Sequence, residues 1–423
     1  MAGGAATSPD IAHHAALDAR MVRAARGIRL LQLASWPVAV QERFLADHAR
    51  GRVAMPQVSY PALDFGDARR ELDAIAAAAD PAHPAGAYVA GSARSWAIAA
   101  QLLESLGTRA AGAHSLALFG SPDEPLPGQG PTTREAARHF IDIANELDHE
   151  LLAPEEQVPI SATSLALQLQ GDLDRFFGER VIAVELDPDM IAKAAAGAFR
   201  IRLRAGALYS DYDRRQLLHH EAFVHSLTAL NGRQQPLFAS MAMASPRTTA
   251  TQEGLATFAE QITGSIDIGR MKRISLRIEA VAMAMDGAGF VDVFGYFLDC
   301  GQSPAESFAS AQRVFRGVPL DGGCAFTKDA VYLRGLVGVH TFFRWALRQQ
   351  RLRLGRLLFA GKMTLGDVQR LEPLFADGSL APPRWLPDWV ARANGLAGML
   401  AFSLFANRIR LEQVDDEAPG FDV

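Results

Sequence analysis

The sequence predicts an α+β protein that is predominantly helical. Most of the chain repeats its apolar residues at the spacing of an amphipathic helix. Only the segments around residues 181–186 and 199–203 have the length or the apolar–polar alternation of strands. Both lie shortly before one long predicted helix, and the chain beyond residue 275 is predicted to be helical almost throughout. These three observations favour a small sheet beside one helix of a helical body.

The N-terminal part, to about residue 150, is predicted to consist of helices preceded by a tail. Residues 1–14 are mostly small or polar, so we expect them to be disordered. Helices are predicted over residues 15–44 (interrupted at Pro37), 67–79 and 92–107. Residues 119–133 contain four prolines and three glycines, which indicates a long loop. Because long loops often connect domains, we place a boundary near residue 150 and treat residues 15–150 as a helical region.

The second part begins with a predicted helix over residues 161–177, followed by the two strands. Tyr209 and Ser210 could extend a third strand, and Asp211 or Asp213 could cap the long helix that follows. That helix is expected to stop before the Asn231-Gly232 pair. Further helices are predicted over residues 251–262 and from 275 to about 411, with breaks at 301–304, 317–323 and 378–383. The apolar run of residues 395–405 is too short to cross a bilayer and predicts a buried helix.

The composition argues against several classes of protein. The chain has 423 residues and a formal net charge of −5, whereas nucleic-acid binders usually carry a basic surplus. Its two cysteines, Cys300 and Cys324, are too few for a disulfide-stapled secreted domain or for a cysteine zinc site. The N-terminus lacks the apolar core of a signal peptide. We therefore expect a cytoplasmic protein that binds neither nucleic acid nor membrane; the sequence does not specify its oligomeric state.

One short segment combines residue types that carry metal chemistry. Residues 219–225 are His-His-Glu-Ala-Phe-Val-His, so three of the eleven histidines fall within seven positions. Catalytic zinc sites use neutral imidazoles and a third protein ligand, and leave one position for water. A nearby carboxylate then takes a proton from that water and later delivers it to the leaving amine. The segment predicts His220 and His225 as ligands of one zinc ion, with Glu221 as the general base.

The spacing of the two histidines does not suit a regular α-helix. In the familiar His-Glu-x-x-His motif the histidines are four residues apart and face one metal. Here they are five apart, which places them about 140° apart on a regular helix, too far to share one ion. The zinc site therefore requires a π-bulge or a widened turn, which is common at functional sites.

A non-metal interpretation of this segment has to be weighed beside the zinc site. Paired histidines on a helix are usually solvated, and the His-Glu-x-x-x-His pattern should occur by chance in roughly one or two chains per hundred. The setting strengthens the metal interpretation. The motif lies in the middle of a predicted helix, has apolar neighbours such as Leu218 and Val224, and follows a strand-like segment.

Glu253 is the candidate third ligand. It opens the predicted helix 251–262, so on this segment alone it could equally be an acid that favours the helix dipole. The histidine motif favours Glu253 as a metal ligand, because two histidines on one helix and a glutamate on the next form the gluzincin arrangement. We therefore expect residues 151–423 to form a zincin-like catalytic domain with a helical C-terminal part and a small sheet beside the zinc helix.

The string Gln252-Glu253-Gly254-Leu255-Ala256 resembles the signature of the bacterial QEGLA-motif proteins, some of which are labelled flavohemoglobin expression modulators. Those proteins are similar to the microtubule-associated tyrosine carboxypeptidases, which remove the C-terminal tyrosine of α-tubulin. The resemblance extends from about residue 30 onward and is strongest over residues 220–256. It implies the same zinc ligands and base as above. Dipeptidyl peptidase III has the same spaced motif on a widened helix.

The resemblance also points to residues that could line a substrate cleft, in the segments 231–236 and 326–332. We consider Asn231 a binding residue, and Arg233, Arg247 or Lys328 a cation for the substrate carboxylate. Tyr332, or a histidine such as His340, could donate to the oxyanion that forms during hydrolysis. For each of these residues surface charge or helix packing is an equally good explanation.

The sequence thus predicts a zinc metallopeptidase, most simply a carboxypeptidase acting on a peptide or protein. Two alternatives remain: a regulatory protein that keeps the zinc site without hydrolysis, and a zinc amidase with a non-peptide substrate. The chain shows no long basic extension that would suit an acidic microtubule surface, so tubulin is not carried over as the substrate.

Overall fold

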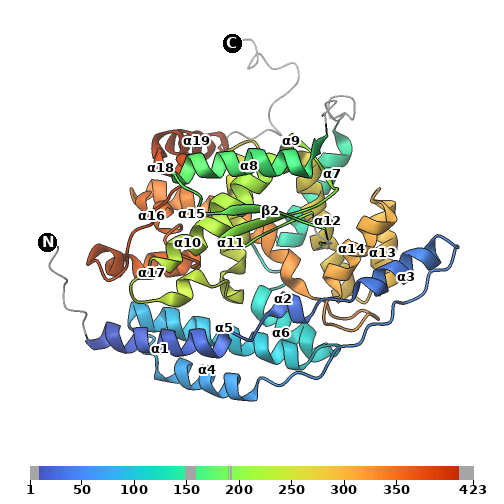
Figure 1. Ribbon diagram of the computed structural model, residues 1–423, viewed down its shortest axis with the longest axis horizontal. Helices are drawn as coiled ribbons and strands as arrows, with labels where there is room; N and C mark the ends of the chain where they lie inside the picture. The colour runs from blue at the N-terminus through green and yellow to red at the C-terminus, as the bar shows by residue number, and fades with distance from the viewer. Residues whose placement is uncertain (1–8, 148–158, 189, 191–192, 409–423) are drawn as a thin grey trace, which may run out of the picture.

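The computed structural model describes residues 9–147, 159–188, 190 and 193–408. Helices make up most of it, together with two small sheets; β2 of the larger sheet lies near the centre of the view (Figure 1). The predicted helix-rich α+β class is confirmed. No helix in these residues is long and apolar enough to cross a bilayer.

The N-terminal helices differ from the prediction at their starts, and two of them, over residues 109–119 and 133–146, were not predicted. They are α1 (Pro9–Ala25), α2 (Leu30–Leu33), α3 (Val38–His48), α4 (Gly66–Ala78), α5 (Pro84–Glu104), α6 (Arg109–Phe119) and α7 (Thr133–Glu146). Residues 9–14, predicted as tail, are helical because Ile11 and His14 are buried; residues 1–8 lie outside the described residues. Helix α5 starts at Pro84, earlier than predicted, because proline fits a first helical turn and His83 accepts the Ala85 amide. The predicted long loop lies between α6 and α7.

The strands form two sheets. They are β1 (Ile160–Ser161), β2 (Ala183–Asp187), β3 (Ala194–Ala196), β4 (Arg200–Arg204) and β5 (Leu208–Tyr209). The order in the larger sheet is β2-β4-β3, with β2 and β4 parallel and β3 antiparallel to β4, whereas β1 pairs with β5. Helix α8 (Ala162–Phe177) packs against β2 and β4, and β3 and β4 contact the helix that carries the histidine motif. Ile201 and Leu203 supply the buried face of β4.

The long motif helix has three parts: α9 (Asp211–Gln216), a π-helix (Leu217–Ser226) and α10 (Leu227–Arg233). Ser210, not an aspartate, caps it: its hydroxyl accepts the Asp213 amide, and the Asp213 carboxylate accepts the Ser210 amide, each at 3.0 Å. The expected stop at Asn231-Gly232 is also wrong. Gly232 lies inside α10, and its role is close packing instead of ending the helix. A Cβ at this position would come within 2.3 Å of the Met241 carbonyl oxygen, so only glycine fits there.

The rest of the chain is helical, as predicted. Its helices are α11 (Thr249–Ile262), α12 (Ile268–Met285), α13 (Phe290–Asp299), α14 (Pro304–Val314), α15 (Val331–Arg348), α16 (Arg353–Leu357), α17 (Leu365–Ala376), α18 (Asp388–Ala391) and α19 (Ala393–Ala406). The three predicted breaks fall between helices. Helix α19 is not buried as predicted: Leu396 and Leu400 pack inward, whereas Phe402 is 72% exposed, because only one face contacts neighbouring helices.

The main hydrophobic cluster joins residues on both sides of residue 150, among them Met21 of α1, Leu102 of α5 and Phe343 of α15. A second cluster lies between α8, the sheets and the π-helix, with Leu169 and Leu217 among its members. The predicted boundary falls in residues 148–158, outside the described residues, so the division into domains stays a prediction.

Candidate metal centre

The π-helix brings His220 and His225 together. Hydrogen bonds in a π-helix join residue i to i+5, so residues five apart lie about one turn apart and on one side. The Nε2 atoms of the two imidazoles are 3.2 Å apart, and the rings meet edge to face. The predicted widening of the helix is confirmed.

Contacts at the C-terminal end of the π-helix fasten it to two neighbouring elements. The Ser226 hydroxyl donates to the Gly197 carbonyl at 2.7 Å, next to β3. The Thr228 hydroxyl donates to the Gln252 side-chain oxygen at 2.9 Å, which joins the helix to α11. The histidines are therefore held in place by both the sheet and α11.

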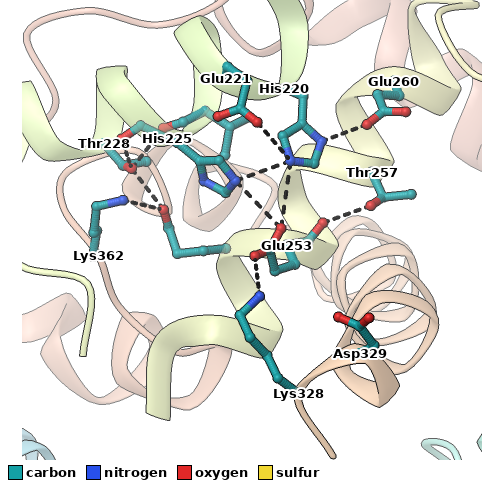
Figure 2. A network of polar contacts seen from close by, with 12 residues as sticks. His220, Glu221, His225, Thr228, Glu253, Thr257, Glu260, Lys328, Asp329 and Lys362 are labelled. Carbon is teal, nitrogen blue, oxygen red and sulfur yellow. Dashed lines mark hydrogen bonds and ion pairs between the residues drawn. The ribbon is translucent and has the colours of Figure 1, made fainter. Parts of the chain in front are cut away.

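Glu253, in the first half of α11, completes a triangle of ligand atoms (Figure 2). Its Oε2 lies 3.6 Å from the Nε2 of His220 and 3.6 Å from that of His225. A triangle with these sides has a circumradius of about 2.0 Å, which matches the Zn–N and Zn–O distances of protein sites. The three predicted ligands thus converge on one point at the right radius, so this donor set fits a zinc ion.

The position of Glu253 depends on how closely α11 packs against α15. A Cβ on Gly254 would come within 2.2 Å of the Gly335 backbone, so neither glycine leaves room for a side chain. This close approach fixes α11, and the carboxylate of Glu253 then faces the histidines. The glycine in the QEGLA string therefore has a packing role beside the ligand.

Glu260 orients His220 from behind, and the sequence did not identify it. Its Oε1 lies 2.5 Å from the Nδ1 of His220, and its carboxylate is fully buried. Arg270 of α12 donates to both oxygens of Glu260. A carboxylate on the second ring nitrogen fixes the tautomer of a ligating histidine and leaves Nε2 free for the metal. Glu260 follows Glu253 by seven residues, two helical turns, and this spacing could have identified it.

The second oxygen of Glu253 is held by Lys328, in the 3₁₀ turn Thr327–Ala330. The Nζ of Lys328 lies 2.9 Å from Oε1 of Glu253, on the side away from the histidines (Figure 2). Lys328 was predicted to bind a substrate carboxylate. The structure brings it to the site but pairs it with a candidate ligand instead.

Glu221, the predicted base, lies beside the triangle. Its Oε1 is 3.9 Å from the Nε2 of His220 (Figure 2). The side chains of Glu221 and His225 are 27% and 19% exposed, against 5% for that of His220. The triangle is therefore reached from outside on the side of Glu221 and His225.

The side chains around the candidate ligands stabilise positive charge on His220 and negative charge on Glu253. Burial alone would lower the pKa of His220, but hydrogen bonds to Glu253 and Glu260 and the nearby carboxylate charges raise it to about 10. Burial would raise the pKa of Glu253, yet the Lys328 ammonium and the two imidazoles hold it well below its usual range. A metal cation competes with protons for such ligands, so this charge pattern suits cation binding.

Lys362 is a second site residue that the sequence did not identify. It is buried, and its Nζ lies 3.2 Å from the Gln252 side-chain oxygen. Burial lowers its pKa to about 8, although the charges of Glu253 and Glu221 oppose this. Nothing in the local sequence distinguishes Lys362, because it reaches the site from the loop between α16 and α17, more than a hundred residues later.

Three predicted binding residues lie in other environments. Asn231 is buried and bonds through both side-chain atoms to the backbone of Phe359, Arg384 and Trp385, so it anchors chain segments. Arg233 is exposed and stacks 4.8 Å from the ring centroid of Phe199. Arg247 donates to Asp367 at 2.7 Å and to Ser92. None of these contacts involves the ligand triangle, because each side chain is already used for packing or pairing.

Tyr332 and His340 both lie on α15 but in different surroundings. The Lys328 ammonium lies 5.1 Å from the centroid of the Tyr332 ring, which puts this tyrosine next to the triangle. His340 packs edge-on against Phe258, two turns further along, and burial lowers its pKa. The described contacts thus place Tyr332, and not His340, near the ligand triangle.

Comparison with known proteins identifies the family of the chain. A model of the microtubule-associated tyrosine carboxypeptidase family matches residues 42–408, a range that contains all three candidate ligands and Glu221. No curated protein matches the chain significantly. The predicted similarity to these carboxypeptidases is confirmed, whereas the closer resemblance to the bacterial QEGLA-motif proteins stays a prediction. The chain belongs to the microtubule-associated tyrosine carboxypeptidase family.

Proposed function

We propose that this protein is a zinc-dependent carboxypeptidase that removes residues from the C-terminus of a peptide or protein. Family membership implies carboxypeptidase activity on protein C-termini. The observation that carries the metal part is the triangle of His220, His225 and Glu253, whose dimensions suit one zinc ion. The same arrangement supports a zincin-like fold around the site, and a cytoplasmic location remains part of the proposal.

The residues around the triangle suggest how hydrolysis proceeds. Zinc, when bound, would lower the pKa of a water molecule and polarise the scissile carbonyl. Glu221 lies on the accessible side, so its carboxylate accepts the proton of the attacking water and passes it to the departing amine. Glu260 holds the tautomer of His220, and Lys328 keeps the second oxygen of Glu253 occupied. Tyr332 is the nearby hydroxyl for the developing oxyanion.

Replacing Glu221 by Gln tests this function. The variant keeps the side-chain size and all three ligands, so it should bind zinc as well as the wild type does. Turnover should fall by about a hundredfold or more, because the proton acceptor is gone. Zinc content is measured by metal analysis, and activity as the loss of C-terminal residues from a pooled peptide library, followed by mass spectrometry.

Glu185→Gln is the matched control, since Glu185 is an exposed carboxylate on β2 that pairs with Arg200. It should leave both zinc content and turnover unchanged. Full activity in Glu221→Gln would rule out this mechanism. Full zinc occupancy of the wild type with no release from any peptide would instead favour a non-hydrolytic binding protein or an amidase with another substrate.

A further inference from the structure

His14 of α1 and His83, the residue before α5, stack where α1 contacts the start of α5. Helix α1 lies along α4 and α5 at one edge of the molecule (Figure 1). The two ring centroids are 4.8 Å apart, and the ring planes are 11° from parallel. His13 meets the ring of His14 edge-on at 5.3 Å. His14 is only 2% exposed, so α1 docks through a histidine that its neighbours enclose.

Both stacked rings accept a backbone hydrogen bond, and this requires both to be neutral. The Nε2 of His14 accepts the Asp80 amide at 3.3 Å, and the Nδ1 of His83 accepts the Ala85 amide at 3.2 Å. An imidazolium has a proton on each nitrogen and cannot accept a hydrogen bond. Protonation of either ring therefore breaks its hydrogen bond and sets two N–H groups against each other.

The start of α5 is an unfavourable place for a cation. The N-terminus of a helix carries the positive end of its dipole, and His83 is the residue that caps α5. The ring of His14 lies against the first turn of this helix, since a Cβ on Gly86 would come within 2.7 Å of its Nε2. Charging His14 would therefore place a cation at the positive end of α5.

The surroundings of His14 favour its neutral form. Burial is the main cause that lowers the pKa of His14, and the backbone of Asp10, one turn earlier in α1, opposes it. A positive charge on His83 or His13 lowers the pKa further, whereas the Asp80 carboxylate raises it. The net result is a pKa below the ordinary value of 6.5. The hydrogen bond to His14 and the electrostatics around it thus agree.

Two other charged side chains of α1 make contacts that do not include His14. Arg20 pairs with Glu71 of α4 at 2.8 Å. Asp18 accepts the Ser240 amide at 3.1 Å, in the short 3₁₀ turn that follows α10. This turn has the sequence Ala-Ser-Met-Ala, so it adds no ionisable side chain beside α1.

The same 3₁₀ turn links α1 to the metal centre. The carbonyl of its Met241 accepts the Lys362 amide at 2.7 Å, and the side chain of Lys362 lies near the ligand triangle (Figure 2). Gly232, near the end of the helix that carries the histidine motif, packs against the same carbonyl. Release of α1 would therefore loosen the support of α10 and of the loop that carries Lys362.

We propose that His14 and His83 form a pH-sensitive latch, which is closed when both rings are neutral and is opened by protonation of His14. In the undocked state His14 is in water, where its pKa is about 6.5. The undocked state then binds the proton more tightly than the docked state does. Docking of α1 is therefore strongest above about pH 7 and weakens as the pH falls below about 6.5. The latch does not depend on the proposed peptidase function.

Hydrogen exchange of the α1 amides tests the latch, with rates corrected for the intrinsic effect of pH. The wild type is compared with His14→Gln, because glutamine places an oxygen near the Nε2 position and does not titrate. From pH 7.5 to pH 5 the wild type should lose about threefold to thirtyfold more protection than the variant, and a histidine of ordinary pKa sets the upper limit. Both proteins contain Asp18, whose own protonation opposes the effect, so that contribution cancels.

His139→Gln is the matched control, because His139 is exposed on α7. It should show the wild-type loss of protection, with all proteins at one fixed zinc concentration. If His14→Gln does not fold by circular dichroism, Asp18→Asn takes its place: without the opposing carboxylate, its α1 should lose protection as the pH falls to 5. An equal response of wild type and His14→Gln, or unchanged protection in Asp18→Asn, would overturn the inference.

NMR of the histidine-labelled wild type gives a second readout that needs no variant. At pH 7.5 the nitrogen shifts should show the proton of His14 on Nδ1 and that of His83 on Nε2, the tautomers that the two hydrogen bonds require. The His14 signal should titrate below pH 6.5. If His14 is charged at pH 7.5, or titrates at or above pH 6.5, a neutral histidine does not hold α1 and the inference fails.

Discussion

Glu260 is the residue whose change should affect zinc affinity without removing a ligand. It touches His220 through Nδ1 and has no contact with the other two ligands among the described residues, so it orients one ligand only. Its pairing with Arg270 also neutralises a half-buried arginine. Changing this carboxylate should therefore alter zinc binding without removing any donor from the triangle.

Glu260→Gln should weaken zinc binding by about tenfold to a hundredfold, the usual effect of losing such an outer carboxylate. Competition with a chelator of known affinity measures the change. Glu279→Gln is the matched control, since Glu279 also pairs with arginines, Arg134 and Arg138, but away from the site. Equal zinc affinity in wild type and Glu260→Gln would mean that this carboxylate serves only to neutralise Arg270.

The residues that the sequence could identify are those that lie close together along the chain. His220, Glu221 and His225 share one helix, and Glu253 lies in the next long one, so their spacing along the chain was enough to predict that they form one site. Lys362 escaped prediction because its neighbours at the site come from segments far away in sequence. Arg247 was misjudged for the same reason: its partner Asp367 lies 120 residues further on.

At the scale of helices, the site depends on two unusual features. The π-helix turns His220 and His225 to one side, and the contact between Gly254 and Gly335 sets where α11 presents Glu253. The sequence required the first feature, because a spacing of five cannot chelate on a regular helix. It gave no sign of the second, since the glycine that faces Gly254 lies on another helix.

Gly254→Ala should disrupt this contact. The added Cβ would come within 2.2 Å of backbone atoms of Gly335, which cannot move aside as a side chain can. We expect a loss of about 3 kcal/mol in the free energy of unfolding, as for other overpacked cores. Zinc affinity should also fall, because α11 carries Glu253. Urea unfolding and chelator competition measure the two effects.

Gly171→Ala is the control for the general effect of alanine in a helix. Gly171 lies in α8, and a Cβ there would meet no atom within 4 Å. Alanine at this position should stabilise the protein by about 0.5–1 kcal/mol. If Gly254→Ala behaved like Gly171→Ala, the two helices would not be as closely packed as described.

At the scale of the whole molecule, the N-terminal helices are part of the main core. Periodicity predicted most helices well, but it does not say which helices pack together, so the sequence suggested a separate N-terminal region. Asp18 of α1 shows one of the connections. It is fully buried, and it accepts hydrogen bonds from the Ser240 amide and hydroxyl, more than two hundred residues away.

Asp18 makes the stability of the whole chain depend on pH. Burial, only partly offset by the bonds from Ser240, raises its pKa from 3.8 to about 6. The folded state therefore holds this proton more tightly than the unfolded state does. The stabilisation that the protonated Asp18 gives to the folded state is fully present below about pH 4 and is lost as the pH rises through about 6. A rise of this size corresponds to about 3 kcal/mol.

Asp18→Asn should remove this dependence, because asparagine does not titrate and keeps an oxygen for the Ser240 amide. From pH 4 to pH 7 the wild type should lose about 2.4 kcal/mol of unfolding free energy relative to Asp18→Asn. Urea unfolding at several pH values, at one fixed zinc concentration, measures the difference. Asp73→Asn, an exposed change on the neighbouring α4, should show the wild-type dependence. A constant difference between wild type and Asp18→Asn across this range would mean that Asp18 stays ionised in the core, and that Ser240 and its neighbours stabilise the carboxylate as well as water does.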